Sequence, residues 1–366
     1  MEKIIVLDFG SQYSHLICRR IREFSVYAEL VPYDISAEEL KKMNPKGIIF
    51  SGGPSSVYNE DAPKPDEELF NFDLPLLGIC YGHQLIVNKF GGKVKRANKE
   101  YGSSLLSMDK DSKLLDGIGE SIRAWMSHGD EAEEIPTNFE VIGHTENSHA
   151  AAIANTDRTV FGIQFHPEVV HTERGTDILK NFVLNVCKAK QEWTMEGFVE
   201  KTVKEISEIE GNVLCGVSGG IDSTVAALLI HKAIGNRLTG VFVDNGLLRL
   251  DESKEIEDMF KNNFSLNFHR RDASEQFLSK LKGITDPEQK RKIVGEEFVQ
   301  VFTEFAKEKG PFKWLAQGTL YPDIIESGVS KGPAAVIKSH HNVGGLPDWL
   351  DLKILEPLKE LYKDEV

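Results

Sequence analysis

Four apolar runs in the first half of the chain each end in a glycine-containing turn, and this feature most constrains the fold. The runs are "KIIVLDFG", "KGIIFSGGP", "PLLGICYG" and "TVFGIQFHPE". Each run is typical of a buried strand that delivers a turn to one edge of a sheet. Helical stretches such as "SQYSHLICRRIREF" lie between several of the runs. This alternation of strand and helix predicts an α/β fold with a largely parallel sheet.

A second series of strands and helices follows a break at "KAKQEWTMEG". It runs from "NVLCGV" through the helical stretch "DSTVAALLIHKAIG" to "LTGVFVDNG" and "LNFHRRD". Because a chain of 366 residues is long for a single hydrophobic core, two domains are expected. We predict an α/β chain with one domain in residues 1–188 and another in residues 189–366, each a mostly parallel sheet with flanking helices.

The composition limits which cellular compartments and which binding partners are expected for the chain. The net charge of -14 argues against a nucleic-acid backbone as the main partner. No stretch approaches the roughly 20 apolar residues that span a membrane, and the start lacks the basic region and cleavage site of a signal peptide. The four cysteines form no CxxC pair. We therefore expect a cytoplasmic protein that binds neither nucleic acid nor membrane.

The stretch "LLGICYGHQLI" places a cysteine between a strand and a helix. Gly78 and Gly82 lie two positions either side of Cys80, as in the G-x-S-x-G elbow that presents a nucleophile. A nucleophile needs a base, and the base needs an orienting group. The run "TVFGIQFHPEV" offers His166 and Glu168, which point the same way on an extended segment because they are two positions apart. The pattern favours a catalytic set over a buried cysteine with an unrelated His-Pro-Glu.

Together, "GICYGHQ" and "QFHPE" resemble the class I (triad) glutamine amidotransferases over most of residues 1–188. The resemblance implies that Cys80 attacks the side-chain amide of glutamine, His166 moves the proton and Glu168 orients the imidazole. A thioester would form with release of ammonia. The segments "FSGGPSS" and "WMSHGDE" match the same family. The expected oxyanion and glutamine-binding residues are Gly52, Gly53, Tyr81, Gln84 and Asp130. For the last two, a helix-surface glutamine and an exposed acid in a turn are the alternatives.

The loop "SGGIDST" follows the apolar strand "VLCGV" and looks like a phosphate-binding loop without its lysine. Its backbone N–H groups and the positive end of the next helix can hold an anion. A carboxylate does not bind phosphate directly, so we expect Asp222 to hold Mg²⁺ that bridges to phosphate oxygens. A glycine-rich turn without a ligand is the alternative. The expected ATP-binding residues of the loop are Ser218, Gly219, Gly220, Ile221, Asp222, Ser223 and Thr224.

This loop resembles the signature of the ATP pyrophosphatases. The resemblance implies that ATP is cleaved between its α and β phosphates, that AMP passes to a substrate oxygen, and that a nucleophile then displaces AMP. "GVFVDNG" matches the strand that this family places near adenine and ribose. Val217 and Val243 are therefore candidates for the adenine wall, with strand core as the alternative. The expected cofactor is Mg²⁺ with ATP, without an organic prosthetic group.

A class I amidotransferase followed by SGGIDS in one chain resembles the GMP synthetase family. "DPEQKRKIVGEEF", "KWLAQGTLYPDIIES" and "IKSHHNVGGLP" also match, so the resemblance covers essentially the whole chain. It implies xanthosine monophosphate (XMP) as the acceptor, whose O2 is adenylated before ammonia displaces AMP and gives GMP. Arg291 is a candidate contact for the XMP phosphate, with a solvated basic face as the alternative. Lys338 is a candidate lid residue that could neutralise developing phosphate charge.

GMP synthetases continue into a C-terminal dimerisation domain that completes the XMP pocket, and nothing after "EPLKELYKDEV" corresponds to it. We expect a homodimer only where that domain is present, and a partial XMP site in this chain. Two rival functions stay open. One is another amidotransferase-coupled ligase that adenylates a different acceptor. The other is a non-catalytic nucleotide-binding relative, against which the intact Cys80, His166 and Glu168 set argues.

Overall fold

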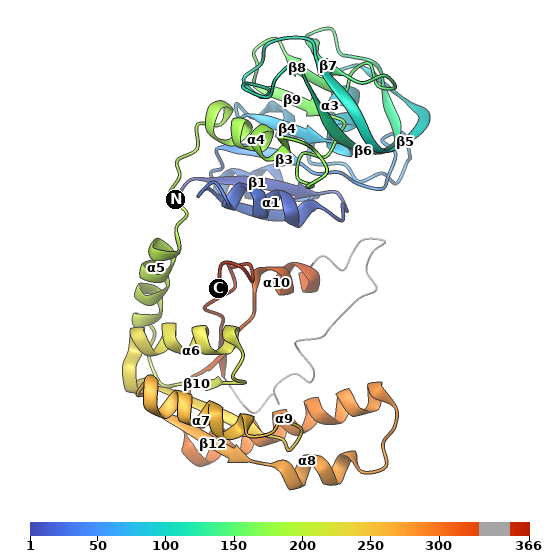
Figure 1. Ribbon diagram of the computed structural model, residues 1–366. Coiled ribbons are helices and arrows are strands. Elements are labelled where there is room, and N and C mark those ends of the chain that lie inside the picture. The colour runs from blue at the N-terminus through green and yellow to red at the C-terminus, as the bar shows by residue number, and fades with distance from the viewer. Residues whose placement is uncertain (329–351) are drawn as a thin grey trace. The chain divides into compact units, whose positions relative to one another are not determined.

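The computed structural model describes residues 1–328 and 352–366, and the chain divides into two units, Met1–Thr194 and Met195–Val366 (Figure 1). Each unit contains one sheet with helices packed against it. The α/β class expected from the sequence is confirmed in both units. Each unit is described below by itself.

The sheet of the first unit has the strand order β2-β1-β3-β4-β9-β8-β7-β5-β6. The first five strands of this order are parallel and the remaining pairs are antiparallel, so the sheet is mixed. The four apolar runs that end in glycine turns form β1, β3, β4 and β9, which are neighbours, so their carboxyl ends meet at one edge. The strands are β1 (Lys3–Asp8), β2 (Tyr27–Pro32), β3 (Gly47–Phe50), β4 (Leu76–Ile79), β5 (Lys93–Met108), β6 (Ser121–Glu134), β7 (Phe139–His144), β8 (Ala152–Asn155) and β9 (Val160–Ile163).

Helices flank the parallel part of this sheet (Figure 1). Ile5 and Leu7 of β1 pack in one core with Leu40 of α2 and with Leu85 and Ile86 of α3. Helix α1 contacts β1, β2 and α4. The α-helices of the unit are α1 (Ser14–Arg22), α2 (Ala37–Lys42), α3 (Tyr81–Lys89) and α4 (Gly175–Lys180), with a 3₁₀ helix at Glu67–Asn71 and a π-helix at Asn181–Val186.

The sheet of the second unit is parallel throughout, with the order β12-β11-β10-β13-β14. From β10 the chain runs outward through β11 and β12, and then returns to the other side of β10 with β13 and β14. Ligands in such sheets bind where the strand order reverses, at the carboxyl ends of the strands. The strands are β10 (Val213–Gly216), β11 (Leu238–Asp244), β12 (Phe268–Asp272), β13 (Trp314–Ala316) and β14 (Lys353–Leu355).

Helices cover both faces of the second sheet. Val213 and Cys215 of β10 pack with α6 and with Phe260 of α7, whereas Leu214 packs with Phe305 of α9. Because successive side chains of a strand point to opposite faces, α6 and α7 lie on one face and α9 lies on the other. The helices are α5 (Met195–Ser207), α6 (Ile221–Ile234), α7 (Glu252–Asn263), α8 (Ser274–Leu281), α9 (Pro287–Lys309) and α10 (Tyr321–Gly328), with a 3₁₀ turn at Gly235–Arg237.

Candidate active sites

Cys80 lies on a sharp turn between β4 and α3, with φ 53° and ψ -101°. A residue other than glycine rarely adopts a positive φ, and such strain persists only where the surroundings impose it. Here the Cys80 N–H donates to the Ile163 carbonyl at 2.8 Å, and the Cys80 carbonyl accepts from the Gln84 N–H at 3.2 Å. The parallel strand β9 on one side and the first turn of α3 on the other therefore hold the elbow.

Two glycines make this elbow possible. A Cβ atom on Gly78 would lie 2.3 Å from the carbonyl oxygen of Gly82, and a Cβ atom on Gly82 would lie 2.5 Å from the carbonyl oxygen of Phe50. Both distances are below van der Waals contact, and both obstacles are backbone atoms that cannot rotate away. The glycine spacing seen in the sequence is thus a packing requirement of the turn.

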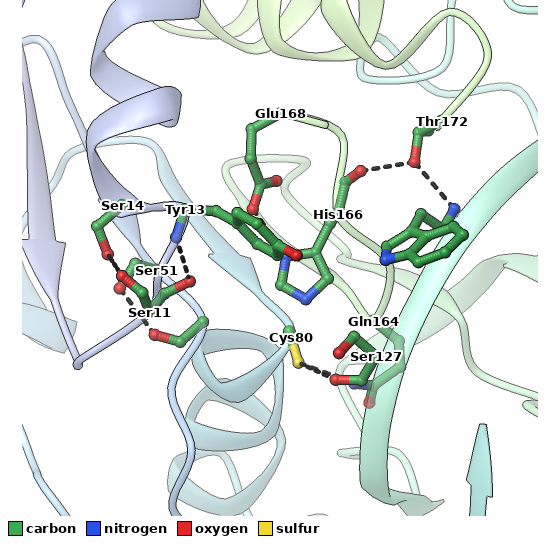
Figure 2. A network of polar contacts seen from close by, with 12 residues as sticks. Ser11, Tyr13, Ser14, Ser51, Cys80, Ser127, Gln164, His166, Glu168 and Thr172 are labelled. Carbon is green, nitrogen blue, oxygen red and sulfur yellow. Dashed lines mark hydrogen bonds and ion pairs between the residues drawn. The ribbon is translucent and has the colours of Figure 1, made fainter. Parts of the chain in front are cut away.

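His166 and Glu168 form a buried pair beside Cys80 (Figure 2). The Nδ1 atom of His166 lies 2.7 Å from Oε1 of Glu168, and Oε2 of Glu168 has no hydrogen-bond partner among the described residues. Burial lowers the pKa of His166, but the charge of Glu168 and the contact with Cys80 outweigh burial and raise that pKa well above its usual value. The imidazole is therefore held ready to carry a proton.

Two residues outside the sequence predictions hold His166, one through its backbone and one through its ring. The Thr172 hydroxyl donates to the His166 carbonyl at 2.6 Å and accepts from the Trp125 N–H at 2.9 Å (Figure 2). The Tyr13 ring packs edge-on to the imidazole, with the ring centroids 5.4 Å apart. The only signal for Thr172 was its place in "HPEVVHT", and Tyr13 gave none because it comes from a distant part of the chain.

The predicted oxyanion residues lie on the loop after β3 and at the start of α3. A Cβ atom on Gly52 would lie 3.1 Å from Cε1 of His166 and 3.7 Å from the Cβ of Cys80, which puts the Gly52 backbone beside the nucleophile. Gly53 packs on the end of β1, since its Cβ would lie 2.6 Å from the Phe9 carbonyl oxygen. Tyr81 directly follows Cys80 as the first residue of α3.

Gln84 and Asp130 are both buried, which excludes the surface glutamine and the exposed acid considered as alternatives. The Gln84 Nε2 donates to the Asp130 carbonyl at 2.9 Å. The Asp130 carboxylate accepts from the Ser56 hydroxyl at 2.5 Å and from the Tyr58 hydroxyl at 2.7 Å. The loop after β3, strand β6 and helix α3 are therefore tied together around Cys80.

The loop after β10 is shaped by its own hydroxyl groups. The Ser218 N–H donates to the Ser223 hydroxyl at 3.1 Å, and the two serine hydroxyls lie 3.0 Å apart. Thr224 donates to the Gly220 carbonyl at 2.9 Å. Gly219 has φ +80°, and a Cβ atom there would lie 2.5 Å from Ile256 of α7, so only glycine fits. The turn into α6 is preformed where the strand order reverses.

Lys363 lies at the first turn of α6, which the sequence did not predict. Its Nζ atom lies 2.5 Å from both carboxylate oxygens of Asp222. The segment "LYKDEV" carries no motif that would point to this loop. Residues 1–328 and 352–366 contain no group of three or more His, Cys, Asp or Glu side chains suited to a metal ion. Among these residues Asp222 belongs to no such group, and its carboxylate is paired with a cation.

The remaining predicted residues do not converge on one point. Val217 packs in the core with α6 and α7, whereas Val243 packs in a separate cluster with α9. Arg291 is exposed near the start of α9 and donates to Glu288 at 2.9 Å. Lys338 lies outside the described residues. Within the described part of the chain, every helix is too short or too polar to span a bilayer.

An elbow cysteine beside a buried histidine–glutamate pair, on the edge of an α/β sheet, defines the first unit as a class I glutamine amidotransferase domain. Residues 5–186 match the family described as "Glutamine amidotransferase class-I", and residues 193–298 match the family described as "NAD synthase". The second match covers the SGGIDST loop and the strands on both sides of it. The chain therefore joins a glutaminase-type domain to an ATP pyrophosphatase-type domain.

The chain belongs to the glutamine-hydrolysing GMP synthase family. It is 54% identical over 368 aligned residues to "GMP synthase [glutamine-hydrolyzing]" of Alkaliphilus metalliredigens, an alignment that covers 100% of this chain and 72% of that protein. The protein of the same name from Clostridium tetani is 51% identical with the same coverage. A solved glutamine amidotransferase from Thermotoga maritima gives a TM-score of 0.39 at 18% identity over 63% of this chain and 90% of that one, too weak to carry a conclusion.

Proposed function

We propose that this chain is a ligase that aminates XMP to GMP with glutamine as the nitrogen donor and ATP as the activating substrate. The other products would be AMP, pyrophosphate and glutamate. One observation carries the proposal: a single chain pairs the Cys80–His166–Glu168 site with the preformed loop at Asp222. Close similarity along the whole chain to proteins named GMP synthase supports XMP as the acceptor.

In the glutaminase half, Cys80 is the nucleophile. Its Sγ atom attacks the side-chain amide carbon of glutamine, and the thiol proton passes to His166, which delivers it to the departing ammonia. Glu168 stabilises the imidazolium, an assignment supported by the 2.7 Å contact and by the raised pKa of His166. Water then cleaves the thioester, which releases glutamate and restores the thiol.

The oxyanion of this reaction would be held by backbone N–H groups of Gly52, Gly53 and Tyr81. Support comes from the close approach of Gly52 to Cys80 and from the place of Tyr81 directly after the nucleophile. Gln84 and Asp130 would bind glutamine. Both lie in the buried polar network around Cys80, where a substrate amide and a charged amino group can find partners.

In the synthetase half, residues 218–224 would hold the β and γ phosphates of ATP as they depart together. We assign Lys363 to the same task, because it brings the positive charge that the loop itself lacks. Mg²⁺ often binds proteins through only one or two carboxylates and completes its shell with phosphates and water. The Asp222 carboxylate therefore fits an ion that arrives with ATP, and such an ion would neutralise phosphate charge.

The remaining assignments rest on the family resemblance. Arg291 would contact the XMP phosphate, Lys338 would act from a lid, and Val217 and Val243 would border the adenine. The domains would span residues 1–188 and 189–366. The protein would act in the cytoplasm without nucleic-acid or membrane partners, as a homodimer where a C-terminal dimerisation domain is present.

The test supplies the chain with ATP, Mg²⁺ and XMP together with either glutamine or ammonium chloride. We expect glutamate from glutamine without added nucleotide, ATP binding, and AMP release that requires XMP, with GMP as the coupled product. AMP release that does not depend on XMP but requires another acceptor would favour a different adenylating ligase. Absence of both glutamine hydrolysis and ATP binding would favour a non-catalytic relative.

A further inference from the structure

The sulfur atom of Cys80 has two polar neighbours besides His166. One is the Ser127 carbonyl oxygen, 3.6 Å from Sγ, and the other is the side-chain nitrogen of Gln164, 3.7 Å from Sγ (Figure 2). Gln164 directly follows β9 and is fully buried. The chain bends at residues 164–165, and the Gln164 and His166 side chains both contact Cys80.

The surrounding hydrogen bonds determine which end of the Gln164 amide faces the sulfur. Gln84 uses Nε2 to donate to the Asp130 carbonyl at 2.9 Å, so this nitrogen is its donor end. The same Nε2 lies 3.5 Å from Oε1 of Gln164, which must therefore be an acceptor. The Gln164 Nε2 is left to donate toward Cys80. The hydrogen bonds therefore assign the orientation of the amide. The shape of the side chain alone cannot, because the amide nitrogen and oxygen are nearly indistinguishable.

The two neighbours suit different protonation states of the sulfur. A thiol S–H can donate to the Ser127 carbonyl oxygen, so that contact suits the protonated form of Cys80. Once the proton has moved to His166, the sulfur can only accept, so the Ser127 carbonyl no longer bonds to it. The Gln164 N–H can then donate to the negative sulfur, and hydrogen bonds to charged groups are the stronger ones. Gln164 is uncharged and does not titrate.

We propose that Gln164 is a further catalytic residue of the glutaminase site, whose side-chain N–H stabilises the Cys80 thiolate while the proton resides on His166. The proposal rests on the function assigned above to Cys80. It adds a neutral donor to the charged histidine–glutamate pair. Through Gln84 and Asp130, the same amide is linked to the residues assigned to glutamine binding.

The test measures how fast iodoacetamide alkylates Cys80 as a function of pH, with the alkylated residue identified by mass spectrometry. Gln164→Met removes the donor without adding charge, and Gln164→Glu keeps the shape but replaces the N–H with oxygen. In both variants we expect the pH of half-maximal alkylation to rise by about one to two units, because a hydrogen bond to a charged group is worth roughly 10- to 100-fold in an equilibrium. The glutaminase kcat should fall by a similar factor, with a smaller change in KM.

Gln191→Met is the matched control. The Gln191 amide donates to the Phe24 carbonyl in the same unit and not to the sulfur, so this variant loses one glutamine hydrogen bond and should keep the alkylation profile. An unchanged profile in folded Gln164→Met would overturn the proposal. So would a shift seen only in Gln164→Glu, since repulsion by the new carboxylate would explain it.

A measurement on the unaltered chain covers the case in which both Gln164 variants fail to fold. The side-chain amide resonance of Gln164 in ¹⁵N-labelled protein should move with pH at the midpoint of Cys80 alkylation, and a resonance that stays still would refute the contact with the thiolate. Neither measurement needs glutamine, ATP or XMP. Failure of this inference is therefore distinguishable from failure of the proposed function, which glutamine hydrolysis by the unaltered chain tests.

Discussion

The Nζ atom of Lys363 lies 2.5 Å from both carboxylate oxygens of Asp222, although 141 positions separate the two residues. The Lys363 side chain is 59% exposed and that of Asp222 30% exposed. Exposed pairs of this kind contribute at most about 1 kcal/mol to stability. The pair lies at the first turn of the helix that follows the loop proposed to hold the ATP phosphates, so a role in holding ATP explains its position better than a role in folding.

Replacing Lys363 should therefore weaken ATP binding without destabilising the protein. In Lys363→Met we expect the ATP dissociation constant to rise about 10- to 100-fold, the range for a lost charge-assisted contact. Titration calorimetry with ATP and Mg²⁺ measures this constant, and thermal unfolding should be unchanged. Lys201→Met is the control. It removes another exposed ion pair of the same unit, Lys201–Glu360, and should bind ATP normally. Equal affinities in the two variants would contradict the assignment.

Cys80→Ala should separate the two halves of the reaction. Glutamine hydrolysis should fall by at least about 1,000-fold, because the attacking atom is gone. ATP binding and any XMP-dependent AMP release driven by ammonium chloride should persist. Asp222→Ala should show the opposite pattern, with glutamine hydrolysis retained and ATP binding lost. Loss of ammonia-driven chemistry in Cys80→Ala would mean that the two sites are not independent.

Gly82→Ala should break the elbow, because the new Cβ would lie 2.5 Å from the Phe50 carbonyl oxygen. Overpacking of this kind costs about 1–3 kcal/mol. We expect a lower urea midpoint for the glutaminase unit and an even larger loss of glutamine hydrolysis, since Cys80 would move. Gly220→Ala is the control for stability: its Cβ would meet only the Ser218 hydroxyl, at 3.3 Å. Normal hydrolysis by Gly82→Ala would show that the elbow geometry is dispensable.

Glu168→Gln should lower the pKa of His166 toward its usual value, because the carboxylate charge that offsets burial is removed. Loss of the orienting charge in comparable triads costs about 10⁴-fold in kcat, and glutamine hydrolysis should fall by a similar factor. A pH titration of the His166 ring by NMR checks the first expectation. A ring that still titrates as in the unaltered chain would show that Glu168 does not hold the proton on His166.

His83 should make the protein sensitive to mild acid. Its ring is completely buried, and neither ring nitrogen has a hydrogen-bond partner among the described residues. Burial, with smaller contributions from His128 and His149, lowers its pKa to about 3. The unfolded state binds a proton near pH 6.5 and the folded state does not, so stability is present above that pH and falls as the pH drops toward 3.

The expected loss from His83 is about 1.4 kcal/mol for each pH unit below roughly 6.5. Urea unfolding between pH 7 and pH 5 measures it. His83→Phe should flatten the dependence even if it lowers stability overall. The same slope in His83→Phe as in the unaltered chain would assign the acid sensitivity to other groups.

The sequence by itself determined those features that depend on residues close together in the chain. The apolar runs identified β1, β3, β4 and β9, because strands buried on both faces need continuous apolar side chains. The spacing of Gly78, Cys80 and Gly82 identified the elbow, since only glycine tolerates backbone atoms 2.3–2.5 Å from its Cβ position. The sequence also paired His166 with Glu168, and their 2.7 Å contact is present, but Glu168 lies in a turn and not on the extended segment that the spacing suggested.

Only the tertiary structure decided which distant residues complete each site. Gln164 meets Cys80 because β9 and β4 are neighbouring parallel strands, and Gln84 meets Asp130 because α3 packs beside β6. Lys363 contacts Asp222 although it lies 141 positions later in the sequence of the second unit. The sequence showed a phosphate-type loop without its lysine. The fold brings a lysine from elsewhere, and such contacts depend on the packing of whole elements rather than on any local pattern.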